Sequence, residues 1–201
     1  RFDLMGILDI ETMNQIRTKL DQINPAIVLY GEGWTADKSP LDEKYRAVKN
    51  NVAQLKRIAV FNDDIRDALK GNNFSGQSKG FVSGQTLREE QVKFGMVAAC
   101  FHPQITYHFV ESSDKPWAME PWQCVNYVSC HDNFTLFDKL ILSSPEANDE
   151  EIQKMICLAG AIILTSQGIP FLHAGTEMAR TKLGDHNSYK SSDSINQIDW
   201  N

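Results

Sequence analysis

The chain has 201 residues, with 20 basic and 26 acidic side chains and a formal net charge of −6. This acidic balance argues against a nucleic-acid partner, because phosphate-binding proteins need a clustered basic face. With 42% hydrophobic and 23% charged residues, the composition is that of a globular protein, and no apolar run reaches the roughly 18 residues that a membrane span needs.

The N-terminal segment predicts a strand, a helix and a second strand. Residues 2–5 have the pattern of a strand's end, and Asp9 is placed to cap a helix over 10–23, whose apolar residues recur three and four positions apart. Residues 26–30 are apolar on both faces, which is typical of a strand in a parallel sheet. A long polar loop is predicted over 31–51.

The middle of the chain repeats this order. A third strand is predicted over 57–61, followed by a short helix over 63–70 that ends at Gly71. A loop rich in glycine and serine then precedes a helix over 83–101.

The last part adds two more strands. A fourth strand is predicted over 124–129, and helices over 135–142 and 149–165, the second with Asn148 as its N-cap. A fifth strand is predicted over 169–174, and the remainder has the composition of a polar loop.

Strands that alternate with helices indicate an α/β fold with a parallel sheet, either an open doubly wound sheet or part of a closed barrel. No glycine-rich phosphate loop follows any predicted strand. Instead Asp3 lies in the first strand, Glu32 just past the second, and His131 and Asp132 just past the fourth. Because reacting groups of a (β/α)8 barrel lie at the C-terminal ends of several strands, this pattern favours the barrel.

A complete barrel needs eight strands and about 250 residues. The five predicted strands, beginning within a strand, therefore imply a partial (β/α)8 TIM barrel in which residues 1–201 form the later part. The chain begins without a targeting segment, which leaves localisation undecided.

Three acids at one barrel rim would converge on one pocket. Mutual repulsion between Asp3, Glu32 and Asp132 would raise one pKa and give a protonated acid beside an ionised partner. Such a pair suits glycoside hydrolysis with retained configuration when the carboxyl groups lie about 5–5.5 Å apart.

Each residue alone has a simpler interpretation. An aspartate at a strand end often caps a turn, Glu32 between two glycines suits an exposed turn, and Asp132 or Asn133 is placed to cap the following helix. A lone histidine such as His131 is usually structural. The functional hypothesis depends on the joint occurrence of these residues after successive strands.

Three segments carry a family resemblance: residues 1–6 (RFDLMG), 30–34 (YGEGW) and 127–136 (YVSCHDNFTL). They resemble sequence motifs of the α-amylase family of glycoside hydrolases, in the form found in its starch-debranching type I pullulanases. The resemblance covers nearly the whole chain, from the fourth barrel strand to just past the eighth. A motif of the family that follows the third strand is not in this sequence.

The resemblance implies a role for each matching residue. Asp3 would be the nucleophile, and Arg1 would pair with it. Glu32 would be the general acid and then the general base. Asp132 would stabilise the oxocarbenium-like transition state, with His131 donating a hydrogen bond beside it.

Further residues of the motifs would contact substrate. Trp34 offers an apolar face to a sugar ring, and Asn133 would line the same cleft. In the loop after the eighth strand, Asn187, Tyr189 and Asp193 match polar positions that resemble substrate contacts.

The implied activity is retaining endo-hydrolysis of α-1,6-glucosidic links in pullulan and in branched starch or glycogen. The alternatives are an isoamylase-type or other α-amylase-family glucan hydrolase, a non-catalytic glucan-binding relative, and a structural domain in which Trp34, Trp117 and Trp122 belong to the core. The expected partner is an α-glucan polysaccharide or oligosaccharide. We expect no useful activity from these residues alone, because half of the barrel wall is missing.

No cofactor is expected in the chemistry, and no metal ligands are assigned. A structural calcium stays open, since Asp63, Asp64 and Asp185 offer carboxylates, although they lack EF-hand spacing. The four cysteines show no metal-binding spacing. We expect free thiols, with Cys124, Cys130 and Cys157 buried among apolar neighbours, although one disulfide is not ruled out.

Overall fold

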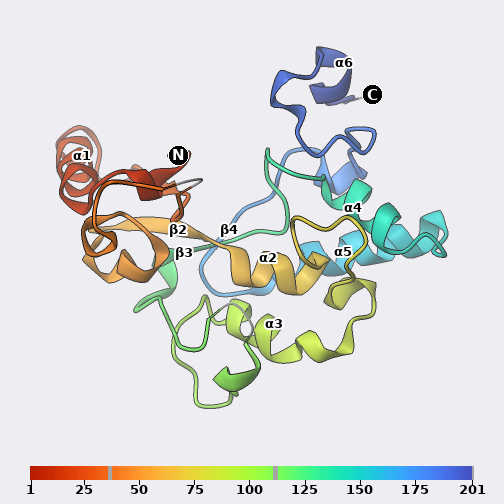
Figure 1. Ribbon diagram of the computed structural model, residues 1–201, viewed down its shortest axis with the longest axis horizontal. Helices are drawn as coiled ribbons and strands as arrows, with labels where there is room; N and C mark the ends of the chain where they lie inside the picture. Colours follow the sequence, from red (N-terminus) through yellow and green to blue (C-terminus); the bar gives the residue numbers. More distant parts are fainter. Residues whose placement is uncertain (36–37, 111–112, 201) are drawn as a thin grey trace.

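The computed structural model describes residues 1–35, 38–110 and 113–200 (Figure 1). Its centre is a four-stranded sheet of parallel strands in the order β1-β2-β3-β4. The strands are β1 (Leu29–Gly31), β2 (Ile58–Asn62), β3 (Cys124–Asn126) and β4 (Ile169–Pro170).

The strand order decides between the two predicted architectures. Each strand pairs with the next one in sequence, and Phe2 adds a parallel bridge to Gly31 at the β1 edge. A doubly wound sheet reverses its strand order at a switch point, whereas a barrel does not. The sheet is therefore a parallel half-barrel.

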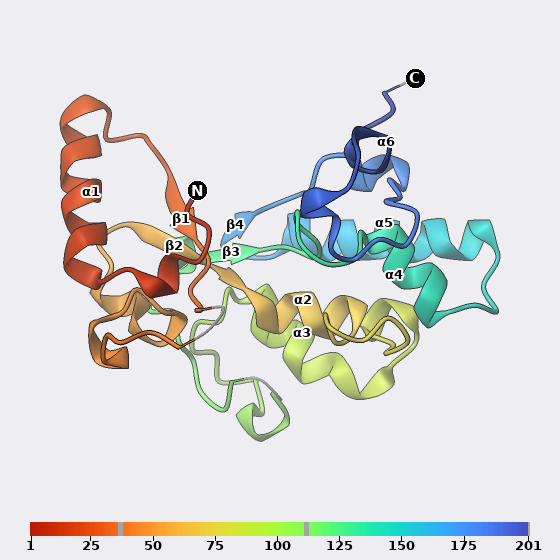
Figure 2. The same cartoon turned by 45° about the horizontal axis from the view of Figure 1, so that its top comes forward.

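Six α-helices in the described residues accompany the sheet. They are α1 (Ile10–Ile23), α2 (Asp63–Lys70), α3 (Glu89–Met96), α4 (Leu136–Ser143), α5 (Asp149–Thr165) and α6 (Asp193–Asn196). Figure 2 shows α1 beside the β1 end of the sheet, with α2 to α5 gathered on the other side. No helix among the described residues combines the length and hydropathy that a bilayer crossing needs.

Local signals explain the helices that were predicted well. The Asp9 side chain accepts a hydrogen bond from the Thr12 backbone N–H and starts α1. The predicted bounds of α2 and α5 are confirmed. Asn148 and Glu151 form a capping box at the start of α5, and Gly71, with φ of 88°, ends α2.

Other elements are shorter than predicted. Only Phe2 of residues 2–5 pairs with the sheet, because Leu4 has φ of 45° and Met5–Ile7 form a 3-10 turn. The helix predicted over 83–101 spans Glu89–Met96 alone, since Ala98 and Ala99 both have positive φ. The loop predicted over 31–51 contains a 3-10 turn at Glu43–Tyr45.

Aromatic side chains fill one face of the sheet. The Phe61 ring lies 4.8 Å from the Tyr127 ring and 5.3 Å from the Phe171 ring, and Tyr30 packs on Phe61 at 5.6 Å. These edge-to-face contacts form a small core with Val125. The Arg1 guanidinium lies 5.6 Å from the centre of the Phe61 ring, so this core adjoins the N-terminal segment.

The cysteines are all free thiols. Cys124 is buried and Cys130 is half-buried, but Cys157 is exposed, so the prediction that Cys157 is buried was wrong. Cys157 lies on the face of α5 that points away from Ile156 and Ile163, which reach the core.

Candidate active site

Backbone pairing brings the first two motifs together. The Phe2 N–H donates to the Tyr30 carbonyl at 2.9 Å, and the Glu32 N–H donates to the Phe2 carbonyl at 3.0 Å. The Gly6 N–H in turn donates to the Glu32 carbonyl at 3.0 Å. This ladder fixes Asp3 beside Glu32 although 29 positions separate them in the sequence.

Close packing explains the glycine on each side of Glu32. A Cβ atom at Gly31 would lie 2.8 Å from the Phe2 carbonyl oxygen, and one at Gly33 would lie 2.8 Å from the Lys49 backbone nitrogen. Both contacts are shorter than real Cβ atoms make, and both involve backbone that cannot turn aside. The backbone on each side of Glu32 therefore packs directly against a neighbouring backbone segment, which fixes the position of Glu32.

The acids and the histidine form one cluster. One oxygen of Asp3, one of Glu32 and one ring nitrogen of His131 all lie within 4.8 Å of one another. The Arg1 guanidinium joins them: its Nη2 donates to Asp3 Oδ1 at 3.2 Å and to Glu32 Oε1 at 2.9 Å, and lies 2.8 Å from His131 Nδ1. Asp3, Glu32 and His131 thus share one site, as the sequence predicted.

Burial sets the electrostatics of Glu32. Its side chain is 4% exposed, and the Leu4 backbone N–H donates to its Oε2 at 2.9 Å. Loss of hydration raises the pKa of Glu32, the Leu4 hydrogen bond opposes that shift, the neighbouring Asp3 charge raises the pKa further and Arg1 lowers it. The net result is a pKa above the usual range, which favours the protonated acid.

His131 links Asp132 to this cluster. His131 Nε2 lies 3.3 Å from Asp3 Oδ1 and 3.4 Å from Asp132 Oδ1. The pKa of His131 is raised, mainly by the Cys130 side chain, and Asp132 adds to the rise. Burial and Arg1 lower the same pKa.

Neither Asp132 nor Asn133 caps the following helix. The N-cap of α4 is Thr135, whose hydroxyl accepts from the Asp138 N–H at 3.1 Å. Asn133 has φ of 63°, and the Asp132 side chain is 62% exposed. The capping interpretation of these two residues was wrong.

A cavity of about 470 Å³ opens beside Glu32. Glu32, Trp34, Asp132 and Asn133 all line it, in agreement with the sequence prediction. The sequence did not indicate the other lining residues, which are Leu4, Thr35, Asp63, Arg66, Lys70, Asn73, Phe74, Tyr127 and Cys130. Arg66 and Lys70 stand four residues apart on α2, a spacing that places them on one helix face and would have indicated a shared surface.

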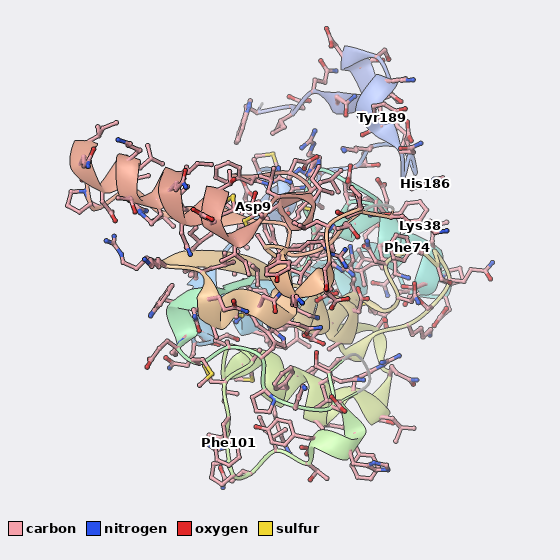
Figure 3. The ribbon with its side chains drawn as sticks, turned by 60° about the vertical axis from the view of Figure 1, so that its left-hand side comes forward. Asp9, Lys38, Phe74, Phe101, His186 and Tyr189 are labelled. Carbon is pink, nitrogen blue, oxygen red and sulfur yellow. The ribbon has the colours of Figure 1, made fainter. Side chains whose placement is uncertain are left out.

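A second cavity, of about 360 Å³, adjoins the first at Asp132. Tyr189, which Figure 3 labels on the C-terminal segment, lines it together with His131 and Asp132. Asn187 and Asp193 are exposed and line neither of these two cavities. Of the three polar residues singled out in this loop, the structure brings only Tyr189 to the acids.

The larger groove of about 1050 Å³ lies along α1 and does not contain the clustered acids. Its lining includes Ile16, Leu20 and Tyr45, and its Asp9 is the α1 N-cap. Figure 3 shows Asp9 well apart from Phe74, which lines the cavity beside Glu32.

The tryptophans differ in their surroundings. Trp117 is buried, and its indole N–H donates to Asp64 Oδ2 at 2.9 Å, so it belongs to the core. Trp34 is half-buried at the cavity, and Trp122 is 41% exposed.

The acids considered for calcium have protein partners. Lys49 Nζ donates to Asp63 at 2.6 Å and to Asp64 at 3.3 Å, and Asp185 accepts from the Ser191 hydroxyl at 2.5 Å. Asp3, Glu32 and His131 are close enough to hold a cation, but the Arg1 guanidinium already contacts all three. We therefore assign no metal ligands.

Comparisons with known proteins agree with the motifs, although no protein-family model matches the chain. The pullulanase of Bacillus subtilis (strain 168) is 42% identical over 200 residues, and chloroplastic pullulanase 1 of Arabidopsis thaliana is 32% identical over 243 residues. The chain is homologous to a segment of the pullulanases. It is covered completely in both comparisons and spans 26% and 25% of these relatives.

Solved pullulanase structures show the same fold. A complex of Paenibacillus barengoltzii pullulanase with maltohexaose and α-cyclodextrin is 51% identical, with a TM-score of 0.89 over all of this chain and 30% of that one. The type I pullulanase of Bacillus subtilis with maltose is 42% identical, with a TM-score of 0.90 over all of this chain and 27% of that one. An isoamylase of a Flavobacterium species is 25% identical over 66% of this chain, so the pullulanase resemblance is the stronger one.

Proposed function

We propose that the protein containing this chain is a retaining glycoside hydrolase that cleaves α-1,6-glucosidic links within pullulan and branched starch or glycogen. The observation that carries the proposal is the Asp3–Glu32 pair. One oxygen from each lies within 4.8 Å, which suits the retaining geometry of about 5–5.5 Å and not the inverting one of about 6.5–9.5 Å.

The two carboxyl groups divide the chemistry between them. Glu32, whose pKa is raised, gives its proton to the glycosidic oxygen while Asp3 attacks the anomeric carbon. The sugar is then bound covalently to Asp3. Glu32 next removes a proton from water, which attacks the same carbon and releases the product with its original configuration.

Neighbouring residues orient this pair. Arg1 donates to both carboxylates and fixes their relative position. His131 contacts both Asp3 and Asp132, which places Asp132 near the nucleophile. From there Asp132 holds sugar hydroxyls as positive charge develops on the ring.

The cavity walls supply the substrate contacts. Trp34 and Asn133 bind glucose units in the cavity of about 470 Å³, and Tyr189 extends the surface beyond Asp132. The motif resemblance alone supports contacts from Asn187 and Asp193.

The sheet supports a place in a larger barrel. We assign the Phe2 segment and β1 to β4 to strands 4 to 8 of a (β/α)8 barrel, with residues 1–201 as the C-terminal part of that catalytic domain. Their sequential parallel order and their shared aromatic face, which includes Phe61 and Tyr127, suit a barrel wall and its interior.

The proposed substrate is an α-glucan. Relatives have been solved with maltohexaose, maltotetraose and maltotriose, and the acids of this chain supply the acid and nucleophile that hydrolysis requires. We propose that the chemistry needs no cofactor.

The test is the linkage and configuration of products made from pullulan by the full-length protein. Proton NMR at early times should show the new reducing ends as the α anomer, and complete digestion should leave maltotriose without α-1,6 links. Limit products that retain the α-1,6 link, or reducing ends that appear first as the β anomer, would overturn the proposal.

A further inference from the structure

Two residues of the cavity beside Glu32 have no part in the proposed hydrolysis. Cys130 lies in the loop after β3, next to His131, and Lys70 is the last residue of α2. Both line the cavity of about 470 Å³. The charge of each also acts on the ionisation of the other.

Lys70 is a buried amine without a partner. The residue is 1% exposed, and among residues 1–35, 38–110 and 113–200 its Nζ makes no hydrogen bond or ion pair. Lys139, which is equally buried, differs: its Nζ donates to the carbonyls of Gly76 and Ser78 at 3.2 and 2.7 Å. A buried ammonium without such acceptors has lost its hydration and gained nothing in return, so Lys70 favours an anion in the cavity.

The charged groups around Lys70 act in both directions. Burial lowers its pKa to about 7, Arg66 lowers it as well, and Cys130 and Asp67 raise it. An anionic sulfur at Cys130 is thus one of the two groups that stabilise the ammonium form.

The surroundings of Cys130 favour ionisation of its thiol. Burial raises its pKa, but the His131 side chain, the Asp132 backbone N–H and Lys70 outweigh that effect and leave it below the usual value. Burial raises the pKa of Cys100 and of Cys124. Cys130 is also half-buried, so a reagent in the cavity can reach it.

We propose that Cys130 is a site of reversible modification by small disulfides of the glutathione class, with His131 beside it and the Lys70 side chain of the same cavity stabilising its thiolate. The thiolate attacks one sulfur of the disulfide and forms a mixed disulfide. The other sulfur leaves as a thiolate and takes a proton from solvent. The attached group then occupies the cavity that Glu32 and Asp132 line.

The experiment treats the full-length protein with glutathione disulfide and follows mixed-disulfide formation by peptide mass spectrometry. Cys157, exposed on α5, is the internal control for a thiol that is accessible but lies outside the cavity. We expect Cys130 to react at least about tenfold faster than Cys157, because its surroundings favour the thiolate, which is the attacking form. Cys130→Ser confirms which peptide carries the adduct.

Two lysine variants separate charge from access. Lys70→Met should slow Cys130 by at least about twofold and leave Cys157 unchanged, whereas Lys70→Arg, which keeps the charge, should retain most of the rate. If Lys70→Met does not fold, the comparison of Cys130 with Cys157 in the unaltered protein decides.

Equal or faster reaction at Cys157 would overturn the proposal, as would an unchanged Cys130 rate in folded Lys70→Met. Neither readout requires hydrolysis. The result therefore stands apart from the proposed glucan-cleaving function.

Discussion

The carboxylates of Asp3 and Glu32 lie within 4.8 Å of each other, yet the Asp3 side chain is 63% exposed and the Glu32 side chain only 4% exposed. Two identical chemical groups thus meet different environments. Burial raises the pKa of Glu32, whereas the Asp3 side chain is open to solvent. Different environments for paired carboxyls are how one site supplies both an acid and a nucleophile.

Glu32→Gln in the full-length protein should lower kcat on pullulan by at least about a thousandfold, because the amide cannot donate the required proton. The Leu4 N–H can still donate to the amide oxygen, so the melting temperature should change little. Steady-state kinetics and thermal unfolding measure the two effects.

A substrate with an activated leaving group is the control for Glu32→Gln. An aryl α-maltotrioside whose phenol leaves without protonation should recover much of the bond-cleavage rate. Equal deficits on both substrates in the first bond-cleavage step, measured as leaving-group release in a single turnover, would show that Glu32 does not act as the acid.

The pH profile should report Glu32 on its alkaline side. Glu32 must be protonated to act, so activity is present below its raised pKa and is lost as the pH rises through that value. Arg1 lowers the pKa of Glu32, so Arg1→Gln should move the alkaline limb of kcat/KM to higher pH. A shift to lower pH would contradict the electrostatic role given to Arg1.

Gly33→Ala should reduce both stability and activity. Its Cβ would lie 2.8 Å from the Lys49 backbone nitrogen, so the chain must move and displace Glu32, at a cost of about 1–3 kcal/mol. We expect a lower unfolding temperature and a fall in kcat of at least about tenfold.

Gly160→Ala is the matched control, because Gly160 lies within α5 and its Cβ would meet nothing within 4 Å. It should stabilise the protein by about 0.5–1 kcal/mol and leave kcat unchanged. If both variants destabilised the protein equally, the crowding at Gly33 would not be the cause.

Helix ends were predictable where the signal is local. The bounds of α2 and α5 follow from caps and Gly71, which act within one turn. Strand lengths were overestimated, since the apolar run over 169–174 continues past the two residues, Ile169–Pro170, that pair with β3. Pairing depends on a neighbouring strand, and an apolar run does not show where that neighbour ends.

The sequence predicted the acids of the site but not the residues that line the cavity around them. Asp3, Glu32 and Asp132 follow strands, and the parallel order of the sheet brings strand ends to one edge. Lys70 gave no such signal, because a lysine at a helix end is usually solvated and only tertiary packing buries it. Cys157 shows the reverse: apolar neighbours suggested burial, but the helix turns this residue outward.

The most direct test of the central claim is to identify the carboxylate that becomes glycosylated. In full-length Glu32→Gln, α-maltotriosyl fluoride needs no acid to react, and the covalent intermediate should accumulate because no base activates water. Peptide mass spectrometry should then find the maltotriosyl group on Asp3. A label on Asp132 or on any other residue, or fluoride release without a covalent adduct, would contradict the account.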